Sequence, residues 1–176
     1  TSISLAFNAY QRGREQLEVV GLTSKRNRAF VESLGIHHRI VSYEDIESLD
    51  RAVPSVFVDM AGDGDGTMRI HRHFGDALKY SCSVGGTHWD RIAFGAEIPG
   101  VQPQLFWAPG QIAKRMQELG AAEFQSRAGE AWKKFLPQID RWLEIERGAG
   151  VDAIAKVYLD TLDGRADPKK GYVLSP

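Results

Sequence analysis

Cysteine is nearly absent from this chain, and its scarcity limits the chemistry available. The 176 residues include one cysteine, Cys82. A single thiol excludes an internal disulfide and a zinc site built from several cysteines. Cys82 falls in a predicted buried strand with no activating base evident in the sequence, so we interpret it as a small core residue and not as a nucleophile.

The chain also lacks a strong net charge and any long apolar run. Lysine plus arginine number 22 and aspartate plus glutamate number 23, which gives a net charge of −1. Because the basic residues are dispersed, no overall field or patch would attract nucleic acid. No apolar run approaches the length of a membrane-spanning helix. With 43% apolar and 26% charged residues, the composition predicts a cytoplasmic globular protein without nucleic-acid or membrane partners.

Motifs for hydrolytic or metal chemistry are missing as well. No serine–histidine–aspartate order and no paired-carboxylate motif stands out. The acidic segment 63–66 lacks the remaining ligands of a calcium loop, so we predict a plain turn there. His71 and His73 occupy alternate positions of a predicted helix and would diverge. His37 and His38 would point to opposite faces beside a strand, and we therefore expect no metal site.

Short apolar runs alternate with helical patterns through the first two thirds of the chain. We predict strands at 17–22, 38–42, 55–60, 78–84 and 105–107, and helices at 2–12, 25–34, 44–49, 67–74 and 111–119. Strands that alternate with helices are typical of an α/β fold with a doubly wound parallel sheet.

Helical periodicity dominates the last third of the sequence. Apolar residues recur at steps of three and four from 124 to 143. Pro137 lies inside this stripe and is expected to kink or split the helix. We predict another helix over 152–163 and a closing strand at 172–174. The C-terminal third is therefore expected to be helical up to its last strand.

The turn after the first predicted strand is the most informative segment. An apolar run ends at Gly21, and the hydroxyls of Thr23 and Ser24 and the cations of Lys25, Arg26 and Arg28 follow at once. In nucleotide-binding α/β folds this turn meets the adenosine ribose, where cations and hydroxyls suit a ribose phosphate. The alternative is a helix with a solvated basic first turn, but cations oppose the helix dipole there. We therefore predict binding of NADP rather than NAD.

The order of these segments resembles the cofactor domain of the medium-chain dehydrogenases/reductases, most closely the zinc-free quinone and enoyl reductases. The resemblance rests on residues 19–35, 40–43, 56–62, 75–85 and 157–174. The whole chain also resembles a bacterial family of unknown function with the same architecture. The resemblance implies an NADPH-dependent oxidoreductase that transfers hydride to a carbonyl or an activated alkene of a small-molecule substrate.

The resemblance also implies which residues bind the cofactor. In those reductases the turn after the second strand binds the 2′-phosphate of the cofactor, and the matching residues here are Thr23, Ser24, Arg26 and Arg28. A tyrosine after the third strand adds its hydroxyl to the same phosphate, and Tyr43 matches it. The ribose would lie beside Ala61 and Gly62, and the nicotinamide beside Ser83, Val84 and Gly85. Small residues suit these last positions because backbone must approach the ligand closely. His88 and Trp89, just beyond, either line a substrate pocket or pack within a loop.

Three parts of that family have no counterpart in this sequence: the first strand, the glycine-rich pyrophosphate turn and the N-terminal catalytic domain. We expect that the chain is the later part of a longer protein, or that another segment supplies the strand. The alternative function is a non-catalytic Rossmann-like binding or assembly module. By the same resemblance, the sheet edge near 105–107 is a candidate homodimer seam. We place a nucleotide-binding domain at 1–110 and C-terminal helices with a closing strand at 111–176.

Overall fold

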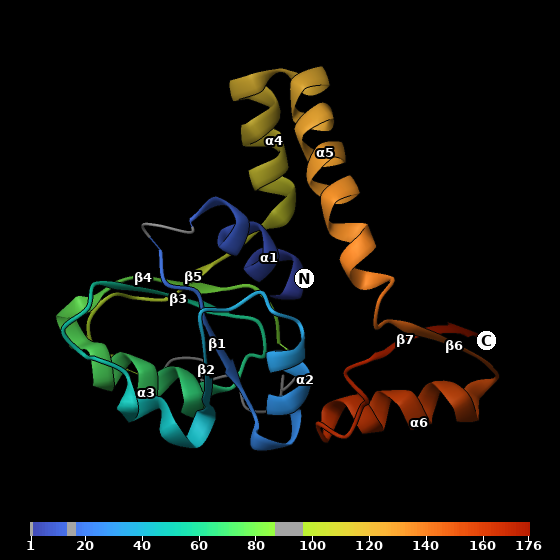
Figure 1. The fold of residues 1–176 in the computed structure, drawn as a ribbon, viewed down its shortest axis with the longest axis horizontal. Helices are drawn as coiled ribbons and strands as arrows, with labels where there is room; N and C mark the ends of the chain where they lie inside the picture. Colours follow the sequence, from blue (N-terminus) through green and yellow to red (C-terminus); the bar gives the residue numbers. More distant parts are fainter. Residues whose placement is uncertain (1, 14–16, 87–96) are drawn as a thin grey trace. The chain divides into compact units, whose positions relative to one another are not determined.

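The computed structural model describes residues 2–13, 17–86 and 97–176 (Figure 1). The chain divides into two compact units, Thr1–Glu118 and Leu119–Pro176. Each unit is described on its own below. The candidate pocket residues His88 and Trp89 lie outside the described residues.

The first unit alternates helices and strands, as the sequence predicts. Its α-helices are α1 (Ser2–Arg12), α2 (Arg28–Ser33), α3 (Gly64–Phe74) and α4 (Ala108–Leu119), the last reaching the unit boundary. Its strands are β1 (Val20–Thr23), β2 (Arg39–Ser42), β3 (Ser55–Asp59), β4 (Leu78–Ser83) and β5 (Gln104–Leu105). Three short 3₁₀ helices complete it: η1 (Lys25–Asn27), η2 (Tyr43–Ser48) and η3 (Gly75–Ala77). The α/β class is thus confirmed.

The strands of the first unit form two small parallel sheets. One contains β1 and β2, and the other has the order β3-β4-β5. Among the described residues, β1 and β3 do not pair, so the strands form small parallel sheets and not clearly one doubly wound sheet.

One hydrophobic core joins elements of both sheets. Ile46, Ile70 and Leu78 are at most 4% exposed. Leu22 of β1 and Phe57 of β3 pack against this cluster, together with Phe74 and Val101. Figure 1 shows α3 lying along one side of the β3-β4 sheet. Each fully buried aliphatic side chain contributes roughly 1.5–3 kcal/mol, so this cluster fixes α3 and η2 beside the strands.

The helix α3 begins earlier than the sequence predicts. Its first residue is Gly64, with Asp63 at the N-cap position. The segment that we predicted as a turn therefore forms the first turn of the helix. Asp65 in this first turn is favourable because a carboxylate complements the positive end of the helix dipole.

The second unit contains a βαβ arrangement that the sequence only partly predicts. Its elements are α5 (Ala121–Ile139), β6 (Glu144–Ala149), α6 (Val151–Leu162) and β7 (Lys170–Ser175). β6 and β7 pair in parallel, with Glu144 beside Lys170. The expectation of a helical C-terminal third was wrong at β6. Pro137 does not split α5, which continues past it to Ile139.

Candidate functional site

The first group of predicted cofactor residues lies at the carboxyl ends of β1 and β2. Parallel pairing places Thr23 opposite Ser42. Ser24 and Tyr43 therefore follow at the same edge, as the next residue of each strand. Ligands of open α/β sheets bind outside the carboxyl ends of strands, so this edge is the candidate site.

The basic side chains follow directly on the chain. Arg26 is an exposed residue of η1, and Arg28 opens α2. Arg28 Nε donates to Glu32 Oε1 at 2.8 Å, in an ion pair whose side chains are about half exposed. Thr23 differs from its neighbours because it is only 7% exposed. The exposed surface of this turn is therefore formed by Lys25 and the arginines, with Ser24 partly exposed beside them.

Tyr43 stands in a more acidic setting than the turn. Burial, and then the charges of Asp59 and Asp63, raise the pKa of Tyr43 above its ordinary value of 10.0. The hydroxyl is a hydrogen-bond donor at neutral pH, as in any tyrosine. The candidate edge thus carries positive charge at η1 and negative charge beside Tyr43.

Asp59, at the end of β3, shapes the loop that follows it. Its Oδ1 accepts hydrogen bonds from the backbone N–H groups of Ala61 and Gly62, both at 2.9 Å. Its Oδ2 accepts the hydroxyl of Thr67 at 3.3 Å. Gly62 has a φ of +75°, a conformation that favours glycine. We did not single out Asp59 from the sequence, although an aspartate that ends a strand before a glycine is a known turn signal.

The second group of predicted residues gathers where β3 and β4 end. Asp59 pairs with Ser83, and the backbone N–H of Val84 donates to the Asp59 carbonyl at 2.8 Å. A Cβ on Gly85 would lie 2.3 Å from the carbonyl oxygen of Met60. Glycine at this position is therefore required by contact between the two backbones, whether or not a ligand approaches. The structure brings Ala61 and Gly62 together with Ser83, Val84 and Gly85.

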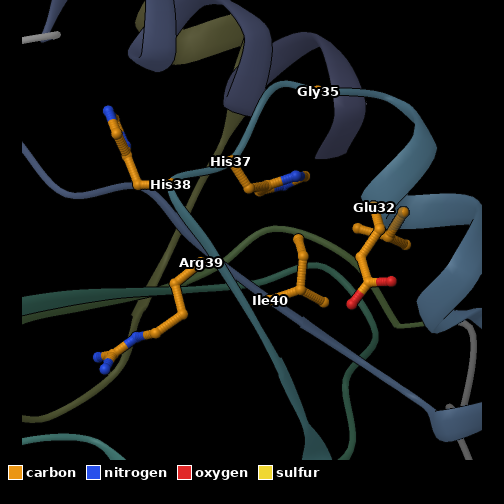
Figure 2. Close-up of a pocket in the computed structure, with 7 residues that line it drawn as sticks. Glu32, Gly35, His37, His38, Arg39 and Ile40 are labelled. Atoms are coloured by element: carbon orange, nitrogen blue, oxygen red, sulfur yellow. The ribbon is translucent and has the colours of Figure 1, made fainter.

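A separate pocket of about 270 Å³ lies at the opposite, amino end of β2 (Figure 2). It is lined by Val31, Glu32, Gly35, His37, His38, Arg39 and Ile40. Figure 2 shows the ring of His37 turned towards the side of the strand that carries Glu32, with His38 and Arg39 on the other side. The pocket and the predicted cofactor edge lie at opposite ends of β2, and Glu32, which lines the pocket, also pairs with Arg28.

The histidines of this pocket serve the packing of the strands. A Cβ on Gly21 would lie 2.8 Å from Cδ2 of the His37 ring, so the ring covers this glycine. The Nδ1 of His37 is buried and has no hydrogen-bond partner in the described part of the chain. Burial, followed by the charge of His38, lowers the pKa of His37. His38 Nδ1 accepts a hydrogen bond from the backbone N–H of Val19 at 2.9 Å.

In residues 2–13, 17–86 and 97–176, no group of three or more histidine, cysteine or acidic residues could hold a metal ion. Over the same part of the chain, no helix combines the length and apolarity needed to cross a bilayer.

The architecture defines an α/β protein with parallel strands, whose predicted site residues follow the carboxyl ends of those strands. The family can also be stated: the chain belongs to DUF2855, a family described as proteins of unknown function, whose model matches residues 1–167. No match was found among curated proteins or among solved structures.

Proposed function

We propose that this chain is the cofactor-binding part of an NADPH-dependent oxidoreductase of the medium-chain class. The reaction would be hydride transfer to a carbonyl or an activated alkene of a small molecule. One observation carries the proposal: the hydroxyl- and arginine-bearing turn and Tyr43 follow two paired strands at one carboxyl edge. In this proposal the two small sheets are parts of one doubly wound sheet.

The residues at the turn suit the 2′-phosphate of NADPH. Ser24 and Arg26 would donate hydrogen bonds to it, and Arg28 would exchange Glu32 for the phosphate. An exposed ion pair such as Arg28–Glu32 contributes about 0.2–1 kcal/mol. A hydrogen bond to a charged group contributes about 1.5–3 kcal/mol. The exchange is therefore favourable, and Tyr43 would add a neutral hydroxyl donor beside the positive charge of the arginines.

The remaining groups would serve the rest of the cofactor. Bound NADPH supplies the hydride, and the protein supplies orientation and electrostatics. The loop held by Asp59 would border the ribose, and Ser83 to Gly85 would border the nicotinamide. The backbone contact between Met60 and Gly85 fixes these two segments relative to each other, so both would meet one ligand as a single surface.

Titration of the full-length protein with NADPH and NADH tests the proposal. We expect NADPH to bind more tightly, and Arg26→Ala to weaken NADPH by roughly tenfold or more while leaving NADH unchanged, because one charge-assisted phosphate contact is lost. Arg51→Ala is the matched control, since Arg51 is an exposed arginine that precedes the amino end of β3. Equal binding of the two nucleotides by the unaltered protein would refute the assignment to NADPH.

A second candidate is a non-catalytic binding or assembly module. The separation of β1-β2 from β3-β4-β5 among the described residues favours it, because a dinucleotide normally spans one continuous sheet. The same titration separates the two functions. A full-length protein that binds neither nucleotide and consumes no NADPH with carbonyl or alkene substrates would be a module of this kind.

A further inference from the structure

Among the described residues of the first unit, the most completely buried titratable side chain is not part of the predicted cofactor site. His71, on α3, has an exposed fraction of 0%. Its Nδ1 lies 3.0 Å from the carbonyl oxygen of Pro99 and its Nε2 lies 2.9 Å from Oγ of Ser81. Ser81, on β4, is itself only 1% exposed. The ring therefore bridges a strand and a loop in the interior.

The partners of His71 determine where its proton lies. A carbonyl oxygen only accepts hydrogen bonds, so Nδ1 must carry the hydrogen that is donated to Pro99. In the neutral ring Nε2 is then an acceptor, and the hydroxyl of Ser81 donates to it. Both ring nitrogens and the serine hydroxyl are satisfied, which removes the cost of burying unpaired polar groups.

The loop that His71 holds returns the chain from β4 to β5. Parallel neighbours need a crossover connection, which is usually a helix. The described parts of this connection, residues 84–86 and 97–103, contain no helix. Gln102 Nε2 donates to the carbonyl of Ile98 at 2.9 Å, and Val101 packs against the hydrophobic core. The His71–Pro99 hydrogen bond is the link from this loop to a buried polar group of α3.

We infer that His71 is a positioning residue for the nicotinamide end of the cofactor. Ser81, which His71 holds, precedes Ser83 by two positions on β4, and the Ser83–Gly85 segment follows directly. The hydrogen bond from His71 to Ser81 thus holds the end of β4 in place. The second hydrogen bond of the same ring, to the Pro99 carbonyl, holds the loop that leads to β5. This inference rests on the proposed function, because it assigns the nicotinamide to Ser83–Gly85.

The affinities of the His71→Asn and Ser81→Ala variants for two ligands distinguish a positioning role from a general effect on stability. NADPH reaches both ends of the proposed site, whereas adenosine 2′,5′-bisphosphate reaches only the arginine-bearing turn. We expect each substitution to weaken NADPH by roughly three- to tenfold, the effect of one net hydrogen bond, and to leave the bisphosphate unchanged. His73→Asn is the matched control, since His73 lies on the same helix but bonds the Leu49 carbonyl. It should leave the ratio of the two affinities unchanged.

Other outcomes overturn the inference in distinguishable ways. Unchanged affinities in both variants would show that the bridge does not reach the site, and equal weakening of both ligands would show a purely structural role. If the unaltered protein bound both ligands but neither substitution weakened NADPH binding, the inference about His71 alone would fail. If it bound neither ligand, the proposed function would fail and the positioning role with it. Hydrogen exchange at residues 97–103 would then still show whether His71→Asn loosens the loop more than His73→Asn does.

Discussion

Removal of the Asp59 carboxylate should destabilise the protein more than removal of any exposed turn aspartate. The side chain is 9% exposed and accepts hydrogen bonds from two backbone N–H groups and from Thr67. Gly62 and Thr67 are themselves buried. Asp59→Ala leaves both of these donors without an acceptor in the interior, whereas the half-buried N–H of Ala61 can be hydrated.

The magnitude follows from the number of donors left unpaired. An unsatisfied buried donor costs about 1–3 kcal/mol, so two of them predict a loss of about 2–6 kcal/mol in the free energy of unfolding. For a chain of this length, a loss of about 3 kcal/mol lowers Tm by roughly 6–12 °C. Asp59→Asn should cost only about 1 kcal/mol, because its amide oxygen still accepts and its NH₂ group can donate to Thr67.

Urea unfolding of three variants measures these differences. Asp50→Ala is the matched control, because Asp50 accepts one backbone N–H, from Ala52, in an exposed turn, and water replaces that bond at a cost below about 1 kcal/mol. The expected order of stability loss is Asp59→Ala, then Asp59→Asn, then Asp50→Ala. If Asp59→Ala were no less stable than Asp50→Ala, the argument from buried donors would be refuted.

Further substitutions test other parts of the structure. Burial and the charge of His38 lower the pKa of His37 from 6.5, so the folded state resists protonation of this ring. The stability contributed by the neutral ring should be full above pH 6.5 and decrease below it. Thermal unfolding between pH 5 and pH 8 should show a smaller decrease in Tm for His37→Gln. Gly85→Ala should lower Tm and weaken NADPH, since its Cβ would lie 2.3 Å from the Met60 carbonyl; an unchanged Tm would contradict the backbone contact. Gly129→Ala should raise stability by about 0.5–1 kcal/mol in denaturant unfolding, because it lies within α5 and a Cβ there meets nothing within 4 Å. Trp107 is 63% exposed beside β5. If this sheet edge is a homodimer interface, Trp107→Lys should shift the mass measured by light scattering from dimer to monomer. A monomeric unaltered protein would exclude this interface.

Local sequence patterns predicted most of the helices and strands, but they missed the strand β6. The apolar run at Val56–Val58 and the amphipathic pattern of α6 were sufficient to locate their elements. β6 was missed because the stripe of α5 continues in sequence through Trp142 and Leu143, and because Glu144–Arg147 has only one apolar residue. This strand is defined by its pairing with β7, a distant partner that periodicity does not detect.

The candidate site shows the same division between local and distant causes. The turn at Thr23–Arg28 was found because its residue types are consecutive. The importance of His71 depends on Ser81 and on Pro99, which lies 28 residues further along the chain. A histidine in a helical pattern gives no indication of such partners. The requirement for glycine at position 85 likewise depends on Met60, which belongs to another strand end.

Every strand pair in the described ranges joins neighbours along the sequence: β1 with β2, β3 with β4, β4 with β5, and β6 with β7. Each crossover therefore spans only part of the chain, although a parallel pair still forms more slowly than a local hairpin. Each pair can form as soon as its second member leaves the ribosome, before later segments have been synthesised. The β structure can therefore be assembled progressively during translation, with few opportunities for pairing with a wrong strand.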